Sequence, residues 1–177
     1  MKKLSVRDLR EYLKGRSHSD LVEDIAHLFK NFDAVREYYQ LRIDGSFSDE
    51  LIARYKLQIE EVFFPKRNKN APLKLSDARQ YITEYTKVAD SPIGQVDLML
   101  YYVEQGVRYT RQHGPINATF YNSLISMYKS AVEIITAEKM QPRFDARCRQ
   151  LVKDTAGIGW GLHDTLTHTY YQHFKMG

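Results

Sequence analysis

Apolar residues recur along almost the whole chain at the three- and four-residue spacing that places them on one face of an α-helix. The first such stretch runs from Val6 to Leu13, with Ser5 and Asp8 spaced as an N-terminal capping box and Gly15 as a stop. The same spacing predicts further helices over residues 21–32, 35–43, 48–65, 76–88, 92–113, 120–135, 144–152 and 162–174. No stretch alternates with period two for more than about four residues, so the pattern does not favour strands.

Two of the predicted helices are long and lie next to one another in the sequence. The stretch 92–113 begins at Ser91-Pro92, an N-cap followed by proline at the first helical position, and ends before Gly114-Pro115. Its apolar arc is wide, and the stretch 120–135 is similarly apolar. We therefore expect an all-α single-domain bundle, or a short helical array, of about eight helices with two long central antiparallel helices.

Length and composition indicate one ordered domain over residues 1–177. The longest apolar run, Leu98 to Val103, is far shorter than a membrane span, and residues 1–10 lack the apolar core of an export signal. The single cysteine, Cys148, cannot form an internal disulfide and is typical of a reducing compartment. A cytoplasmic protein with no membrane contact is expected.

The net charge of +4 is spread evenly, apart from one basic stretch between residues 65 and 75. This stretch has prolines, asparagines and no helical periodicity, and it is predicted to be an exposed loop. Its four positive residues, Lys66, Arg67, Lys69 and Lys74, could contact only a few phosphates. Nucleic-acid binding is therefore expected to be weak and non-specific, and a specific nucleic-acid partner is not favoured.

The richest segment for ligand chemistry runs from Asp154 to His173. Gly157, Gly159 and Gly161 alternate just before a predicted helix, where backbone N–H groups are suited to binding an anion. The alternative is that these glycines allow a tight turn and close packing around Trp160. The spacing is neither the dinucleotide-binding pattern nor a phosphate-binding P-loop.

Charged residues of other helices offer a second possibility. Asp97 and Glu104 lie seven residues apart, hence on one face of the most apolar predicted helix. They could form one polar pocket with the Asp154–Asp164 segment and a counter-charge from Arg108 or Arg147. The alternative is a set of structural salt bridges. The ligand-binding candidates are thus Asp97, Glu104, Asp154, Gly157, Gly159, Trp160, His163 and Asp164.

No complete catalytic or metal-binding pattern is present. His163-Asp164 invites comparison with helical histidine-aspartate phosphohydrolases, but no later aspartate follows to complete their metal site. Cys148 lies on an apolar helix face, where a free thiol is usually inert. We therefore expect no catalytic residue, no metal and no cofactor. The thirteen tyrosines are typical of core edges and of protein–protein interfaces.

Four stretches carry a likeness to a known family: 62–65 (VFFP), 97–104 (DLMLYYVE), 120–123 (FYNS) and 154–164 (DTAGIGWGLHD). They resemble a bacterial family of small helical proteins of unknown function, over most of the chain from Leu9 to Phe174. The resemblance implies no activity, cofactor or site residue. The expected function is a non-enzymatic interaction module, with a protein partner or a second copy. The alternatives are a small-ligand binder or enzyme, and a weak nucleic-acid-binding adaptor.

Overall fold

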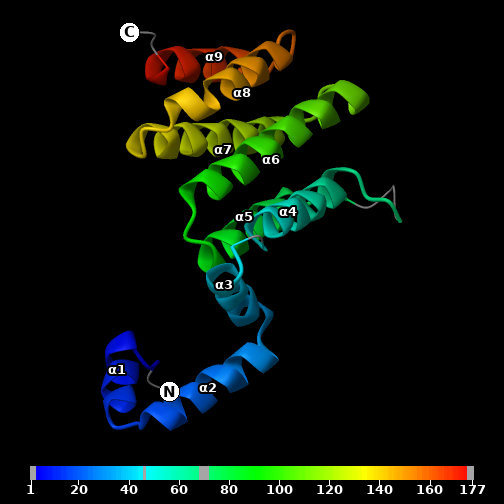
Figure 1. Cartoon of the computed structure of the whole chain (residues 1–177). Coiled ribbons are helices and arrows are strands. Elements are labelled where there is room, and N and C mark those ends of the chain that lie inside the picture. The colour runs from blue at the N-terminus through cyan, green and yellow to red at the C-terminus, as the bar shows by residue number, and fades with distance from the viewer. Residues whose placement is uncertain (1–2, 46, 68–71, 175–177) are drawn as a thin grey trace. The chain divides into compact units, whose positions relative to one another are not determined.

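The chain is built from helices joined by short connections (Figure 1). The structure, a computed structural model, describes residues 3–45, 47–67 and 72–174. Nine α-helices and no strand occur within these three ranges, which confirms the all-α prediction. Contacts within the chain divide it into two compact units, Met1–Phe47 and Ser48–Gly177. That they fold together as one domain of residues 1–177 remains a prediction.

The first unit contains three short helices, α1 (Val6–Lys14), α2 (His18–Asn31) and α3 (Asp33–Ile43). Two capping boxes fix its first two helix starts: Ser5 pairs with Asp8, as the sequence predicts, and Ser17 pairs with Asp20. None of the three helices buries a residue. Their stability is therefore local, from caps and ion pairs within and between neighbouring turns, rather than from a core.

The second unit contains the remaining helices and the apolar core. Local signals set both ends of helix α6. At its start the Ser91 hydroxyl accepts a hydrogen bond from the N–H of Gly94 at 3.2 Å, and Pro92 is the first helical residue. At its end Gly114 is the C-cap, with a φ of 79°. The helices are α4 (Phe47–Phe63), α5 (Leu75–Val88), α6 (Pro92–His113), α7 (Ala118–Ala137), α8 (Gln141–Asp154) and α9 (Leu162–His173).

Helix α6 is enclosed on several sides, because it contacts α5, α7 and α8. Its buried residues accordingly surround its axis, and Leu98, Leu100 and Val103 are fully buried. Its glycines permit the closest approaches. A Cβ at Gly106 would overlap the Leu124 side chain of α7, which is itself fully buried. Close packing of α6 against α7 therefore depends on the missing side chain.

Helices α7, α8 and α9 complete the second unit and contact one another. Cys148 of α8 is fully buried, so its thiol is part of the core, and burial raises its pKa to about 12. Among the described residues, no helix is both long and apolar enough to cross a membrane.

Candidate functional site

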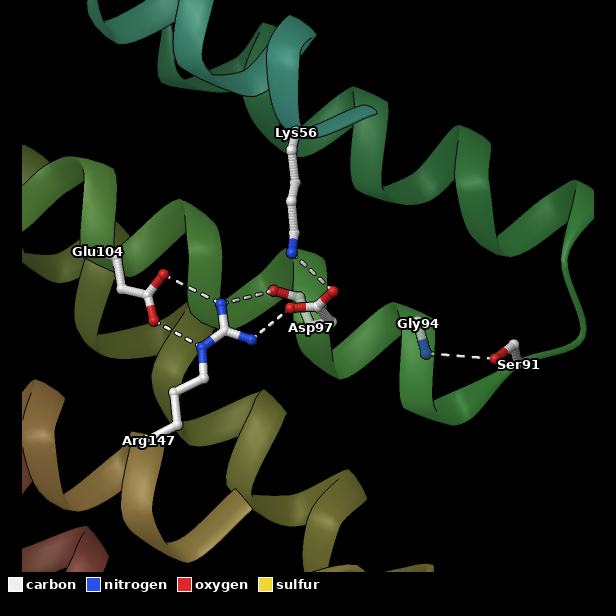
Figure 2. Close-up of polar contacts among 6 residues, drawn as sticks. All are labelled: Lys56, Ser91, Gly94, Asp97, Glu104 and Arg147. Atoms are coloured by element: carbon white, nitrogen blue, oxygen red, sulfur yellow. Dashed lines mark hydrogen bonds and ion pairs between the residues drawn. The ribbon is translucent and has the colours of Figure 1, made fainter. Parts of the chain in front are cut away.

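A cluster of four charged side chains joins α4, α6 and α8 (Figure 2). Arg147 of α8 donates from Nε to Glu104 Oε1 at 2.6 Å and from Nη2 to Glu104 Oε2 at 3.0 Å. Its Nη1 donates to Asp97 Oδ1, and its Nη2 also reaches the Asp97 carbonyl oxygen at 3.2 Å. Lys56 of α4 binds Asp97 Oδ2 at 2.8 Å. We call these residues, Lys56, Asp97, Glu104 and Arg147, the ion-pair cluster.

The ion-pair cluster is electrically balanced and its polar atoms are largely occupied. Burial by itself would raise the pKa of Asp97, but the hydrogen bonds and positive charges of Lys56 and Arg147 outweigh it and lower that pKa. Burial would likewise lower the pKa of Arg147, and its two carboxylate partners raise it instead. The Asp97 carboxylate therefore stays ionised, and Arg147 engages both carboxylates, which suits them to fastening three helices together rather than to proton transfer.

A cavity of about 680 Å³ lies beside this cluster. Lys56, Asp97 and Arg147 form part of its wall, together with Arg143 and the exposed Asp49 near the start of α4. The charges around it are mixed, so the cavity presents no single sign to a ligand.

The glycine segment, defined here as residues 154–164, connects α8 to α9 and curls beside a second cavity. Gly157 and Gly161 have φ values of 80° and 71°, which explains glycine at both positions. Trp160 also has a positive φ, of 60°, a strained conformation for a bulky residue that costs on the order of 1–3 kcal/mol. Its indole stacks on Tyr121 of α7, with ring centroids 6.0 Å apart and planes 15° from parallel.

The glycine segment differs from what close packing would require. Apart from the residues next to it in the chain, a Cβ built at Gly157 or at Gly159 would meet no atom within 4 Å, so no side chain from elsewhere in the fold adjoins either position. Gly159 has neither a positive φ nor a close neighbour to account for glycine. The alternative considered from the sequence, a tight turn with close packing around Trp160, fits Gly157 through its positive φ, whereas the turn does not require glycine at position 159.

The second cavity, which we call the glycine cavity, has a volume of about 670 Å³. Thr110 and Arg111 line it from the end of α6, opposite the glycine segment and its Trp160. Arg111 donates two hydrogen bonds to the Asp154 carbonyl oxygen, from Nε at 3.2 Å and from Nη2 at 2.7 Å. This contact anchors the start of the glycine segment on α6. The whole lining consists of Thr110, Arg111, Gly114, Pro115, Tyr121, Ala156, Gly157, Ile158, Gly159 and Trp160.

The polar side chains of the glycine segment have separate surroundings. His163 Nδ1 lies 2.9 Å from the hydroxyl of Thr155, which is fully buried and also donates to the Val152 carbonyl oxygen. The Asp154 carboxylate accepts from Gln150 within α8. Asp164 is exposed in the first turn of α9. Among the described residues, no three His, Cys, Asp or Glu side chains gather as metal ligands would.

The eight ligand candidates thus fall into two places instead of one pocket. Asp97 and Glu104 belong to the ion-pair cluster, with Arg147 as their counter-charge, whereas Arg108 pairs with Glu60 at 2.8 Å. The two cavities share no lining residue. About fourteen residues of α6, or roughly 21 Å at the helical rise, separate Asp97 from Arg111.

The basic stretch lies between α4 and α5. Lys66, Arg67 and Lys74 are exposed, and the Lys66 N–H donates to the Glu61 carboxylate at 2.8 Å. Lys69 lies outside the described residues. Weak, non-specific nucleic-acid binding by this stretch stays a prediction.

Residues 3–45, here called the N-terminal arm, expose their apolar side chains instead of burying them. The arm carries equal numbers of positive and negative residues, eight Lys or Arg and eight Asp or Glu. Many of these charges are paired locally, as in Lys14–Glu11 and Arg36–Asp33, both at 2.8 Å. The large apolar side chains that it exposes are Leu4, Val6, Leu9, Tyr12, Val22, Ile25, Leu28, Phe32, Tyr38 and Ile43.

Several residues of these sites were not predicted from the sequence. Lys56, Thr110 and Arg111 stand in ordinary helical stretches with no motif around them, and Tyr121 looks like any core-edge tyrosine. The one local signal is the turn at Gly114-Pro115, which directly follows the helix end that carries Thr110 and Arg111.

Comparison with known proteins adds a family without an assigned activity. Residues 4–174 match the profile of a family of unknown function, DUF6155. The match spans the N-terminal arm and most of the second unit, and it confirms the resemblance to an uncharacterised family. No curated protein and no solved structure matches the chain.

Proposed function

The chain belongs to this family of unknown function, and we propose that it is a non-enzymatic helical interaction module. In this proposal it pairs with a second copy through the N-terminal arm. The observation that carries the proposal is the contrast within the arm: ten large apolar side chains are exposed, and none of its helices buries a residue. A helix with an apolar face ordinarily buries that face against another element.

The exposed area matches what a dimer interface needs. With side-chain areas of roughly 150–200 Å², the exposed fractions of these ten residues leave on the order of 1000 Å² of apolar surface open to water. A standard interface removes about 800 Å² from each partner. The arm therefore exposes enough apolar area for one face of a stable dimer.

The charges of the arm favour a second copy over a charged partner. Eight positive and eight negative residues leave no net charge for an acidic or basic protein to recognise. The capping boxes and local ion pairs also form the helices in advance, so little ordering is required on association. An equally neutral, equally apolar helical face is the best complement, and another arm supplies it. The proposal includes a cytoplasmic location, which the single unpaired cysteine favours.

Sedimentation velocity over about 1–100 µM protein, the range in which an ordinary dimer dissociates, tests the pairing. We expect a monomer–dimer equilibrium that Leu9→Asp and Ile25→Asp each shift toward monomer by roughly 100-fold, because a charge replaces buried apolar area. Leu57→Asp on α4 is the matched control, since Leu57 is 59% exposed and Leu9 is 53% exposed. A chain that stays monomeric throughout, or that Leu57→Asp dissociates equally well, contradicts the proposal.

A further inference from the structure

We propose that the glycine cavity binds a small molecule that combines a planar ring with an anionic group and is about the size of a mononucleotide. Its volume of about 670 Å³ lies in the range of about 300–1,000 Å³ that is usual for small-molecule sites. The proposal is independent of the pairing through the N-terminal arm, because every lining residue belongs to the second unit.

A buried hydroxyl without a partner points to a ligand. Thr110 lines the cavity and is 7% exposed, and its hydroxyl makes no hydrogen bond within the part of the chain that the structure describes. Buried polar groups are nearly always satisfied, and of the six unpartnered buried groups among the described residues only Thr110 belongs to the wall of this cavity. Its oxygen is closed off from solvent, so a ligand oxygen would accept from this hydroxyl once the Thr110 side chain turns toward the cavity.

The same wall supplies positive charge and further donors. Arg111 uses Nε and Nη2 on a backbone carbonyl and forms no ion pair with a described carboxylate, so its charge is not neutralised by a neighbour. The backbone N–H groups of Gly157, Gly159 and Trp160 donate no backbone hydrogen bond within the described ranges. One cation and several free donors beside one cavity favour an anion.

The open space over Gly159 fits the same ligand. Any other residue there would project a side chain into space that is empty in the free protein, although nothing in the fold forbids it. Glycine at this position leaves the backbone accessible to a close-lying group, as glycine does where a backbone contacts a phosphate. A ligand lying over Gly159 would account for the missing side chain.

Trp160 supplies the surface for the planar ring. It lines the cavity, stacks on Tyr121 with one face and remains 56% exposed. Tyr121 is in turn fixed by its hydroxyl, which accepts from the Ile116 N–H at 3.3 Å. An indole held in this way, in a backbone conformation that bulky residues avoid, is a rigid platform on which a ring can stack.

Trp160 is the single tryptophan of the chain, so its fluorescence reports binding at this cavity directly. We would titrate the full-length protein with adenosine monophosphate, and with benzoate as a carboxylate source of the same ring-plus-anion chemistry. Adenosine alone and inorganic phosphate alone provide the ring and the anion separately. We expect saturable quenching by at least one ring-bearing anion, with adenosine and phosphate each at least about tenfold weaker.

Two variants test the assignment of the wall. Thr110→Val is expected to weaken binding about tenfold while raising the melting temperature, because it removes a hydroxyl that has no partner in the free protein. Gly159→Ala is expected to fold normally, since its Cβ meets nothing within 4 Å, and to lose binding. Arg111→Met is expected to weaken binding, whereas the control Arg108→Met, whose residue does not line the cavity, leaves it unchanged.

The proposal is overturned by any of three results. These are no saturable signal from either ring-bearing anion up to about 10 mM, adenosine binding as tightly as its monophosphate, or unchanged affinity in both Thr110→Val and Gly159→Ala. A preference for benzoate over the monophosphate supports the proposal and identifies a carboxylate as the anion. Failure of this titration leaves the pairing through the N-terminal arm untouched, since that is read by sedimentation.

Discussion

Replacing Arg147 by methionine tests whether the ion-pair cluster fastens α4, α6 and α8 together. The substitution keeps most of the aliphatic stem but removes every guanidinium contact to Asp97 and Glu104. Asp97 retains Lys56, whereas the carboxylate of Glu104 loses both of its oxygens' hydrogen bonds to Arg147. The variant should therefore be less stable, mainly because of Glu104.

The size of the effect follows from partial burial. Breaking a fully buried ion pair destabilises a protein by about 3–5 kcal/mol. Here the side chains of Arg147 and Glu104 are 27% and 32% exposed, so water screens the remaining charge. We expect a loss of about 2 kcal/mol in the free energy of unfolding, and a melting temperature lower by roughly 4–8 °C. Urea unfolding followed by circular dichroism measures the first quantity, and a thermal scan the second.

Two further variants make the test specific. Arg108→Met removes an arginine of the same unit whose ion pair, with Glu60, is half exposed on the arginine side, and it should cost less than about 1 kcal/mol. Adding Glu104→Gln to Arg147→Met should recover about half of the loss, because the stranded charge is removed. If Arg147→Met costs no more than Arg108→Met, or if Glu104→Gln recovers nothing, the reasoning about this cluster is wrong.

Three other predictions concern the second unit. The pKa of Asp97 is lowered in the folded state, so its contribution to stability is complete above its ordinary pKa of 3.8 and is lost as the pH falls through the lowered value. Urea titrations at several acidic pH values should therefore show a steeper loss of stability in the wild type than in Asp97→Asn. Gly106→Ala should destabilise the protein by about 1–2 kcal/mol, since the cost of the overlap with Leu124 exceeds a helix-propensity gain of about 1 kcal/mol. In a Leu124→Ala background the same change should become stabilising, and a double-mutant cycle of the two positions measures this reversal. His163→Ala should lower stability by about 1 kcal/mol, because the buried Thr155 hydroxyl loses one partner but keeps its bond to a carbonyl, and an unchanged unfolding free energy would favour a functional role for this histidine.

The helices could be predicted from the sequence because their signals are local. The cap at Ser91, the proline after it and the glycine at 114 lie at the ends of the helix that they bound, and α6 begins and ends where they predict. The capping box at Ser5 and Asp8 is a further example. Nine helices, instead of about eight, follow the predicted apolar stretches closely.

The sites could not be predicted in the same way, because their residues meet through tertiary packing. Arg147 pairs with the carboxylate of Asp97, fifty residues earlier in the chain. The sequence offered Arg108 and Arg147 as counter-charges without distinguishing between them. Lys56 joins them from a third helix with no motif to mark it. Thr110 is a candidate only because its hydroxyl is buried without a hydrogen-bond partner. That property arises from tertiary packing, which the spacing of residues along the chain does not encode.

The burial of Cys148 makes the rate of thiol labelling a measure of how often the protein opens around α8. Its thiol is fully buried and its pKa is raised to about 12, so at neutral pH almost no thiolate exists and no reagent has access. Labelling by a thiol reagent must therefore wait until α8 separates from its neighbours, and the labelling rate counts these events. Because the chain has no second cysteine, each molecule is labelled once, and an intact mass spectrum separates the molecules that have opened from those that have not.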